Sequence, residues 1–77
     1  MPIPIDELRN EYESAGKGWY RAAFGSIIRR YFDEIDRMTA DEKRELIASI
    51  GAPKSYYTEL CKELKGVEYD RLHGHIS

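Results

Sequence analysis

The apolar residues between positions 18 and 37 recur with the period of an α-helix. An apolar side chain follows every three or four residues, at Phe24, Ile28, Tyr31, Ile35 and Met38. This spacing places them on one side of a helix, and further apolar residues between them widen the stripe. A helix that is apolar over so much of its circumference normally packs against more than one neighbour. The pattern therefore predicts a central helix over residues 18–37.

Three shorter amphipathic segments accompany this helix. They cover residues 5–14, 40–50 and 53–65, and residues 67–77 remain as a tail. No stretch shows the alternation of apolar and polar residues that a half-buried strand would give. The sequence thus predicts an all-α fold with a single domain over residues 1–77. We expect a compact bundle of about four helices with a short, partly disordered C-terminal tail.

Local signals mark the boundaries of two helices. Thr39, followed three residues later by Glu42, forms a capping box at the start of the third helix. Gly51 stands where a helix often takes its C-terminal cap, and Pro53 fits the first turn of the next helix. We therefore expect the segment GAPKSYYTEL, residues 51–60, to hold a turn and the start of the last helix.

The facing apolar stripes of the three longest predicted helices identify the core. Its expected members are Phe24, Ile28, Tyr31, Ile35, Leu46, Ile50, Tyr57 and Leu60. Trp19 is expected to anchor the start of the central helix in this core, and Cys61 to pack there as an inert thiol. Gly25 stands inside the central helix, where glycine costs about 1 kcal/mol relative to alanine. Its presence predicts that another helix, from the same chain or from a partner, approaches closely at this point, and packing within the chain is favoured.

Composition narrows the class of protein. The chain has 77 residues, of which 42% are hydrophobic and 34% charged, as in a small folded domain and unlike a disordered chain. Cys61 is the only cysteine, and the N-terminal residues do not resemble a signal peptide. No apolar run approaches the ~20 residues of a membrane span. We therefore expect a soluble, cytoplasmic protein that does not enter a membrane.

Residues with catalytic or metal-binding chemistry are sparse. His73 and His75 lie two positions apart in the tail without a third ligand nearby, whereas a zinc site needs three or four protein ligands. Acidic pairs such as Asp33 with Glu34 have no histidine or glycine loop beside them. The sequence therefore predicts a protein that is not an enzyme and holds no metal or cofactor.

Charge is unevenly distributed along the chain. The net charge of −2 gives no general attraction to nucleic acid or to an anionic membrane. Between positions 17 and 30, however, every charged residue is basic. Arginine and aromatic side chains are frequent anchors of protein interfaces. The residues that we expect to bind a protein partner are Lys17, Trp19, Tyr20, Arg21, Arg29 and Arg30.

Residues 44–64, RELIASIGAPKSYYTELCKEL, resemble a helix-turn-helix motif. Ile47 is larger than the residue that this motif prefers where its helices cross, and Tyr57 is large for its buried position. The resemblance implies five DNA-contacting residues: Lys54, Ser55, Thr58, Lys62 and Lys65. We expect Glu59 and Glu63 to share the same face and to repel the phosphates of DNA.

These observations favour a function in binding rather than in catalysis. On charge, a protein partner is favoured over nucleic acid, and we expect a small regulator, adaptor or inhibitor that docks on a larger protein or complex. A homodimer is a further option. Small acidic helical chains of this form are common among accessory proteins of phages and mobile elements. The alternative is a helix-turn-helix transcriptional regulator that binds DNA through residues 44–64.

Overall fold

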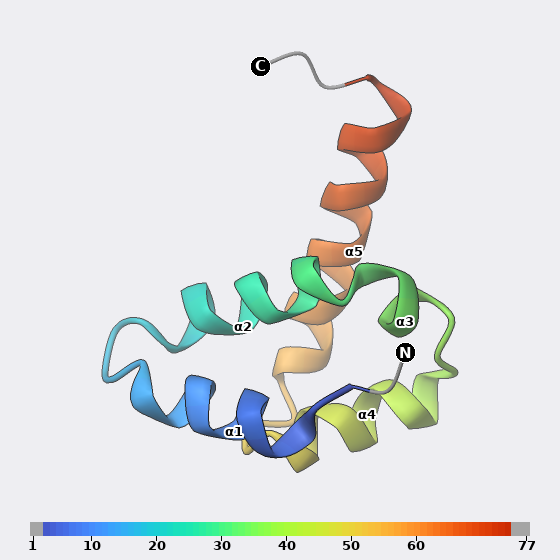
Figure 1. Cartoon of the computed structure of the whole chain (residues 1–77). Helices are drawn as coiled ribbons and strands as arrows, with labels where there is room; N and C mark the ends of the chain where they lie inside the picture. Colours follow the sequence, from blue (N-terminus) through green and yellow to red (C-terminus); the bar gives the residue numbers. More distant parts are fainter. Residues whose placement is uncertain (1–2, 75–77) are drawn as a thin grey trace.

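Residues 3–74 fold as five helices joined by short turns (Figure 1). The computed structural model describes residues 3–74. The helices are α1 (Ile5–Ser14), α2 (Tyr20–Arg30), α3 (Phe32–Asp36), α4 (Ala40–Ser49) and α5 (Tyr56–Leu72). Residues 3–74 contain no strand, so the predicted all-α fold is confirmed. None of the described helices has the length and the apolar composition that crossing a bilayer requires.

The prediction of one continuous helix over residues 18–37 is wrong, because the chain bends at Tyr31. The φ and ψ angles there are −113° and 32°, and α2 gives way to the short helix α3. Neither proline nor glycine causes the bend. It turns Phe32 and Ile35 inward, where both are buried, and α3 packs against α5. The burial of two large apolar side chains compensates for the interrupted helix.

The last helix also departs from the prediction at both ends. Residues 53–55 form a turn with i to i+3 hydrogen bonds, and the helix proper begins at Tyr56. It then continues through Gly66 to Leu72, into the predicted tail. Contacts with α3 hold this extension, since the Arg71 guanidinium lies 4.4 Å from the centre of the Phe32 ring. Residues 75–77 of the predicted tail lie outside the described residues.

The end of α5 extends beyond the other helices. Figure 1 shows its last turns rising away from the body formed by α1 to α4. The radius of gyration is 12.4 Å, against about 11.5 Å expected for a compact chain of this length. The C-terminal part of α5 is therefore a projecting element with solvent on most sides.

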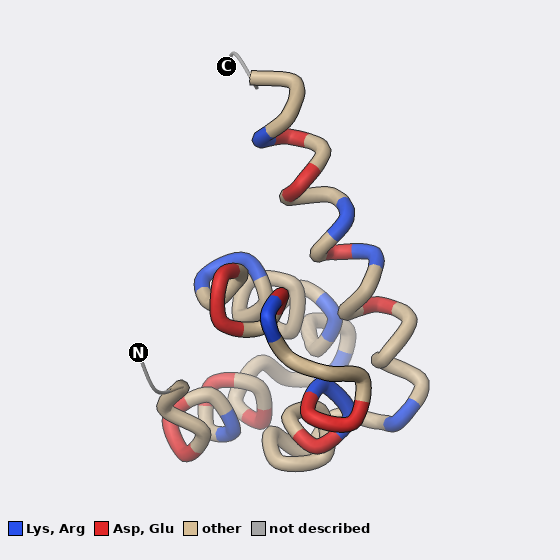
Figure 2. Tube along the Cα trace, turned by 90° about the vertical axis from the view of Figure 1, so that its right-hand side faces the viewer, with Lys and Arg blue, Asp and Glu red and all other residues tan. Residues whose placement is uncertain are grey.

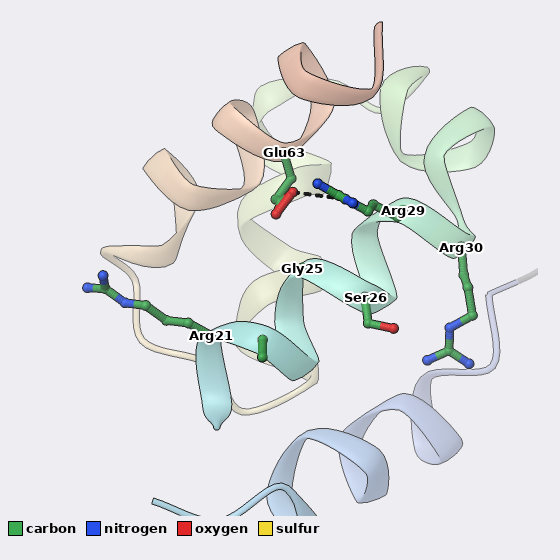
Figure 3. A pocket seen from close by; sticks show the side chains of 7 residues that line it. Arg21, Gly25, Ser26, Arg29, Arg30 and Glu63 are labelled. Carbon is green, nitrogen blue, oxygen red and sulfur yellow. Dashed lines mark hydrogen bonds and ion pairs between the residues drawn. The ribbon is translucent and has the colours of Figure 1, made fainter. Parts of the chain in front are cut away.

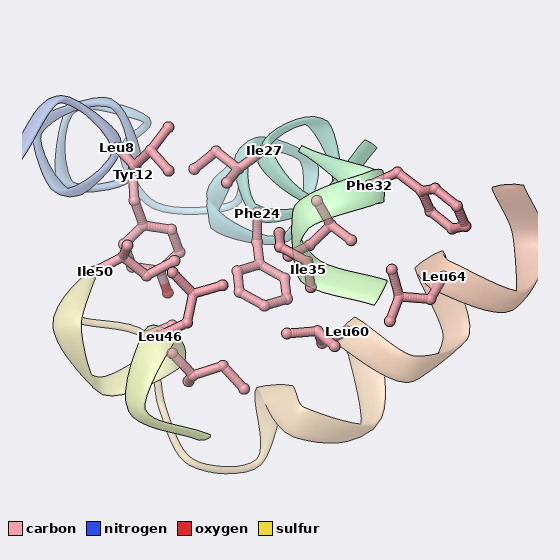
Figure 4. Close-up of a cluster of buried hydrophobic side chains, with 13 residues drawn as sticks. Leu8, Tyr12, Phe24, Ile27, Phe32, Ile35, Leu46, Ile50, Leu60 and Leu64 are labelled. Carbon is pink, nitrogen blue, oxygen red and sulfur yellow. The ribbon is translucent and has the colours of Figure 1, made fainter. Parts of the chain in front are cut away.

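The core lies where α1, α2, α3, α4 and α5 face one another. Six of the eight predicted members are buried: Phe24, Ile28, Ile35, Leu46, Ile50 and Leu60. Figure 4 shows Phe24, Ile35 and Leu60 pointing toward one another from α2, α3 and α5. Tyr31 and Tyr57 are only half-buried. Seven further hydrophobic residues are buried with them: Leu8, Tyr12, Ile27, Phe32, Ile47, Ala52 and Leu64.

Trp19 does not anchor the core, contrary to prediction. Its side chain is 67% exposed. It lies in the turn before α2, and the aromatic residue that turns inward there is its neighbour Tyr20. The Tyr20 ring packs against Tyr12 with 5.1 Å between ring centres. Cys61, expected to be buried, is half-buried on α5.

Gly25 lies at the point where α2 and α5 meet. It is buried, and a Cβ atom added there would lie 2.8 Å from Oε2 of Glu63 on α5. The predicted close approach of a second helix of the same chain is therefore confirmed. Because a larger residue would displace the Glu63 carboxylate, the missing side chain of Gly25 makes room for the ion pair described below.

Candidate nucleic-acid interface on α4 and α5

The geometry of the α4–α5 joint follows from two local motifs. At the start of α4, the Thr39 hydroxyl accepts a hydrogen bond from the backbone N–H of Glu42. The Glu42 carboxylate in turn accepts one from the backbone N–H of Thr39. The predicted capping box is thus confirmed. At the end of α4, Gly51 has a φ of +85°, and the Ala52 N–H donates to the Ile47 carbonyl at 3.0 Å. This is the hydrogen-bond pattern of a glycine-capped helix end, which reverses the chain direction.

Apolar contacts hold the two helices in place around this turn. Leu46 on α4, Ile50 at its C-terminal cap, Ala52 in the turn and Leu60 on α5 are all buried. These are positions that a helix-turn-helix motif buries. Ile47, the oversized residue of the motif, is also buried. It contributes to a hollow of about 280 Å³ at the joint, beside Arg44 and Lys54.

The outer side of α5 and the turn before it carry the residues that the motif resemblance assigns to DNA. We call this set the lysine stripe: Lys54, Ser55, Thr58, Lys62 and Lys65. All five are exposed. At 100° per residue, Thr58, Lys62 and Lys65 lie on the side of the helix opposite the buried Leu60 and Leu64. The stripe therefore points away from the body of the protein.

Glu59 and Glu63 do not belong to this outer side, contrary to prediction. Both are half-buried on the flank of α5 that faces α2. Oε1 of Glu59 lies 3.8 Å from Arg21, and Oε1 of Glu63 lies 3.2 Å from Nε of Arg29. The second pair is drawn in Figure 3. The order of charges along a helix does not show which flank a neighbouring helix covers, and here α2 covers the acidic flank.

Ion pairing divides the basic residues into two groups. Within residues 3–74, six of the seven arginines lie within 4.0 Å of a carboxylate, whereas none of the five lysines does. Basic and acidic positions alternate along the trace of α5 in Figure 2. Of the acidic residues of α5, Glu59 and Glu63 are paired with α2, whereas Glu68 is exposed three residues after Lys65. The lysine stripe thus presents positive charge that no carboxylate of the described residues neutralises by direct contact.

The residues predicted to bind a protein partner are only partly brought together. Arg21, Arg29 and Arg30 line a shallow hollow of about 480 Å³ above Gly25 and Ser26 (Figure 3). All three arginines form ion pairs within the chain. Arg21 and Arg29 pair with Glu59 and Glu63 of α5, and Arg30 pairs with Glu11. The hydrogen bond with Glu11 raises the pKa of Arg30.

The other three members of that set lie apart from this hollow. Lys17 and Trp19 are exposed in the turn between α1 and α2, and Tyr20 is half-buried against Tyr12. None of the three lines the arginine hollow. Tyr20 instead lines a smaller hollow together with Arg21, so Arg21 borders both hollows.

Two exposed apolar residues on α5 were not predicted. Tyr69 is 60% exposed and Leu72 is 76% exposed, both on the projecting end of the helix. They continue the outer stripe at spacings of four and three residues after Lys65, so the same periodicity would have found them had α5 been extended past Gly66. His73 stacks on Tyr69 with 3.9 Å between ring centres.

No cluster of three or more histidine, cysteine or acidic side chains that could hold a metal ion occurs within residues 3–74. His73 lies within 3.1 Å of the Tyr69 carbonyl through Nδ1, and His75 lies outside the described residues.

Comparisons with protein-family models, curated proteins and solved structures give no match for this chain. The candidate site is therefore defined by its own geometry alone.

Proposed function

We propose that the protein is a DNA-binding domain in which α4 and α5 act as a helix-turn-helix unit. The observation that carries the proposal is the position of Glu59 and Glu63. They were the main local reason to disfavour DNA, and their ion pairs with Arg21 and Arg29 hold them on the flank of α5 that faces α2. With the glutamates on that flank, the outer side of α5 offers lysine and hydroxyl side chains, which supports contact with DNA at this face.

The proposed docking places the outer side of α5 in the major groove of DNA. The groove is about 12 Å wide, which matches the diameter of an α-helix. The Lys54, Lys62 and Lys65 ammonium groups would contact phosphates on either side, because a flexible lysine binds phosphate as a point charge. Ser55 is the N-cap residue of α5 and Thr58 lies in its first turn, where hydroxyl groups suit phosphates or base edges.

The charges of the lysine stripe set the expected strength of binding. If three lysines each neutralise one phosphate, the logarithm of the binding constant should fall with the logarithm of salt concentration with a slope of roughly −2.7. Non-specific affinity should then lie in the range of about 10⁻⁴ to 10⁻⁶ M at physiological salt. The net charge of −2 provides no long-range steering, so this contact is local.

Fluorescence anisotropy with a labelled duplex of mixed sequence tests the proposal. Binding should weaken with salt along the slope given above, and Lys62→Glu should weaken it roughly tenfold or more by replacing attraction with repulsion. Arg37→Glu is the matched control, because it makes the same change of charge at an exposed residue outside the lysine stripe. Circular dichroism would establish that both variants remain folded.

Two results would contradict the proposal. One is the absence of salt-dependent binding. The other is an equal loss in Lys62→Glu and Arg37→Glu, because that would reflect net charge and not the α5 face.

A further inference from the structure

A groove lies on the side of α4 that faces away from the lysine stripe. Its volume is about 440 Å³, and it is bounded by the N-terminal segment, α3 and α4. On α4, Glu42, Glu45 and Leu46 line this groove, whereas Arg44 and Ala48 line the hollow beside Lys54. At 100° per residue these two sets lie on nearly opposite sides of the helix. The groove is therefore separate from the proposed DNA-binding face.

The floor of the groove is apolar. Ile5 and Met38 are half-buried and pack against the core, with the buried Leu46 between α4 and the body. Part of the aliphatic surface of these side chains is therefore not covered by the rest of the domain and is in contact with water. Met38 also adds adaptability, because an unbranched thioether fits differently shaped apolar partners.

The rim of the groove is acidic. Glu34, Glu42 and Glu45 line it, and no lysine or arginine does. Within residues 3–74, no basic group lies within 4.0 Å of the carboxylates of Glu34 and Glu45. Arg9 approaches one end, where its Nε donates to the Ser49 carbonyl at 2.8 Å. Its charge is shared with Asp6, so the rim keeps its negative potential.

We propose that this groove binds a short basic amphipathic segment of a partner protein, with apolar side chains on the floor and lysine or arginine at the rim. The charge of the rim selects this class of partner. Three carboxylates repel nucleic acid phosphates and anionic lipid headgroups, whereas they attract a cationic peptide and fix its register. The apolar floor supplies the binding free energy that surface charges alone rarely provide.

Anisotropy with defined synthetic peptides tests this inference. The probe is a fluorescein-labelled amphipathic peptide of roughly 14 residues, made of leucine and lysine. One control peptide replaces the leucines with serine and keeps the charge, and the other replaces the lysines with glutamate and keeps the apolar face. The leucine–lysine peptide should bind with a Kd of about 10 μM or below, and both control peptides at least roughly tenfold more weakly.

Charge-reversing variants then locate the site. Glu34→Lys and Glu45→Lys should each weaken the binding of the leucine–lysine peptide roughly tenfold. Glu68→Lys, an equal change at an exposed position on α5, should leave it within about twofold. The milder variants Glu34→Gln and Glu45→Gln preserve the shape of the side chain and guard against loss of the fold.

Three outcomes would overturn the inference. These are no binding of the leucine–lysine peptide at a concentration well above the expected Kd, equal binding of the serine–lysine peptide, or an equal effect of Glu68→Lys. Because no DNA is present in the experiment, its result is independent of the proposed function of the lysine stripe.

Discussion

Two leucines on α5 provide a matched test of the core. Leu60 is fully buried, with 0% of its surface exposed, whereas Leu72 is 76% exposed on the projecting end of the same helix. Leu60→Ala and Leu72→Ala make the same chemical change with the same small effect on helix propensity. Any difference between the two variants therefore reports the packing around Leu60.

The expected difference is large for a domain of this size. Removing a buried leucine side chain costs about 2 to 5 kcal/mol, and the cost is highest where neighbours cannot collapse into the cavity. Leu60 lies among Phe24 and Ile35 from two other helices (Figure 4), so we expect about 3 kcal/mol or more. A chain of 77 residues has roughly 4 to 12 kcal/mol of stability in total. Leu72→Ala should change it by less than about 0.5 kcal/mol.

Thermal and urea unfolding followed by circular dichroism measure this difference. A loss of 3 kcal/mol corresponds to a decrease in Tm of roughly 12 to 24 °C for a domain of this length. The dependence on urea should keep its slope, because the exposed surface of the unfolded chain hardly changes. Similar Tm values for the two variants, or a larger decrease in Leu72→Ala, would refute the placement of α5 in the core.

Three further predictions concern single residues. In urea unfolding, Thr39→Ala should lower the free energy of unfolding by about 1 kcal/mol, because it removes the N-terminal cap of α4. The control is Thr58→Ala, at an exposed position that caps no helix. It should change the free energy of unfolding by less than about 0.5 kcal/mol. Gly51→Ala should cost about 1 to 2 kcal/mol in the same assay, because the φ of +85° is unfavourable for a residue with a Cβ atom; unchanged stability would contradict the turn geometry. Burial, with a smaller effect of Tyr56, raises the pKa of Tyr12 from 10.0 to about 12. Between pH 10 and 12, Tyr12 therefore loses its proton only in the unfolded chain, so the stability of the fold should decrease over this range and stay unaffected by Tyr12 below pH 10. That decrease should be less steep in Tyr12→Phe.

Local sequence signals predicted the parts of the fold that depend on local interactions. The capping box at Thr39 needs only residues three apart, and the turn at Gly51 needs only one residue that tolerates a positive φ. Both could be identified without knowing the rest of the chain. The apolar period of three and four residues likewise identified the buried side of α2 and of α5, because that side is a property of a single helix.

Features that depend on neighbouring helices could not be predicted in this way. The bend at Tyr31 exists because it directs Phe32 and Ile35 toward α5, and no residue type at the bend signals it. Gly66 is a plausible end for an isolated helix, yet contacts between Arg71 and α3 carry α5 beyond it. Trp19 and Tyr20 are adjacent aromatic residues, and only the position of Tyr12 on α1 decides which of them turns inward.

The candidate DNA-binding face depends on the same kind of information. In the sequence, Glu59 and Glu63 stand one residue away from Thr58 and Lys62, and an isolated helix would present all four side chains to solvent. In the folded protein, α2 covers one flank of α5, and the absent side chain at Gly25 leaves space for the Glu63 carboxylate beside it. The arginines that hold these glutamates are themselves part of the basic segment of α2. The arginines of these pairs are exposed, and such pairs contribute little to stability, but they engage the two carboxylates that would otherwise lie free beside the lysines. The charge of a helix surface is therefore set by the helix that packs beside it.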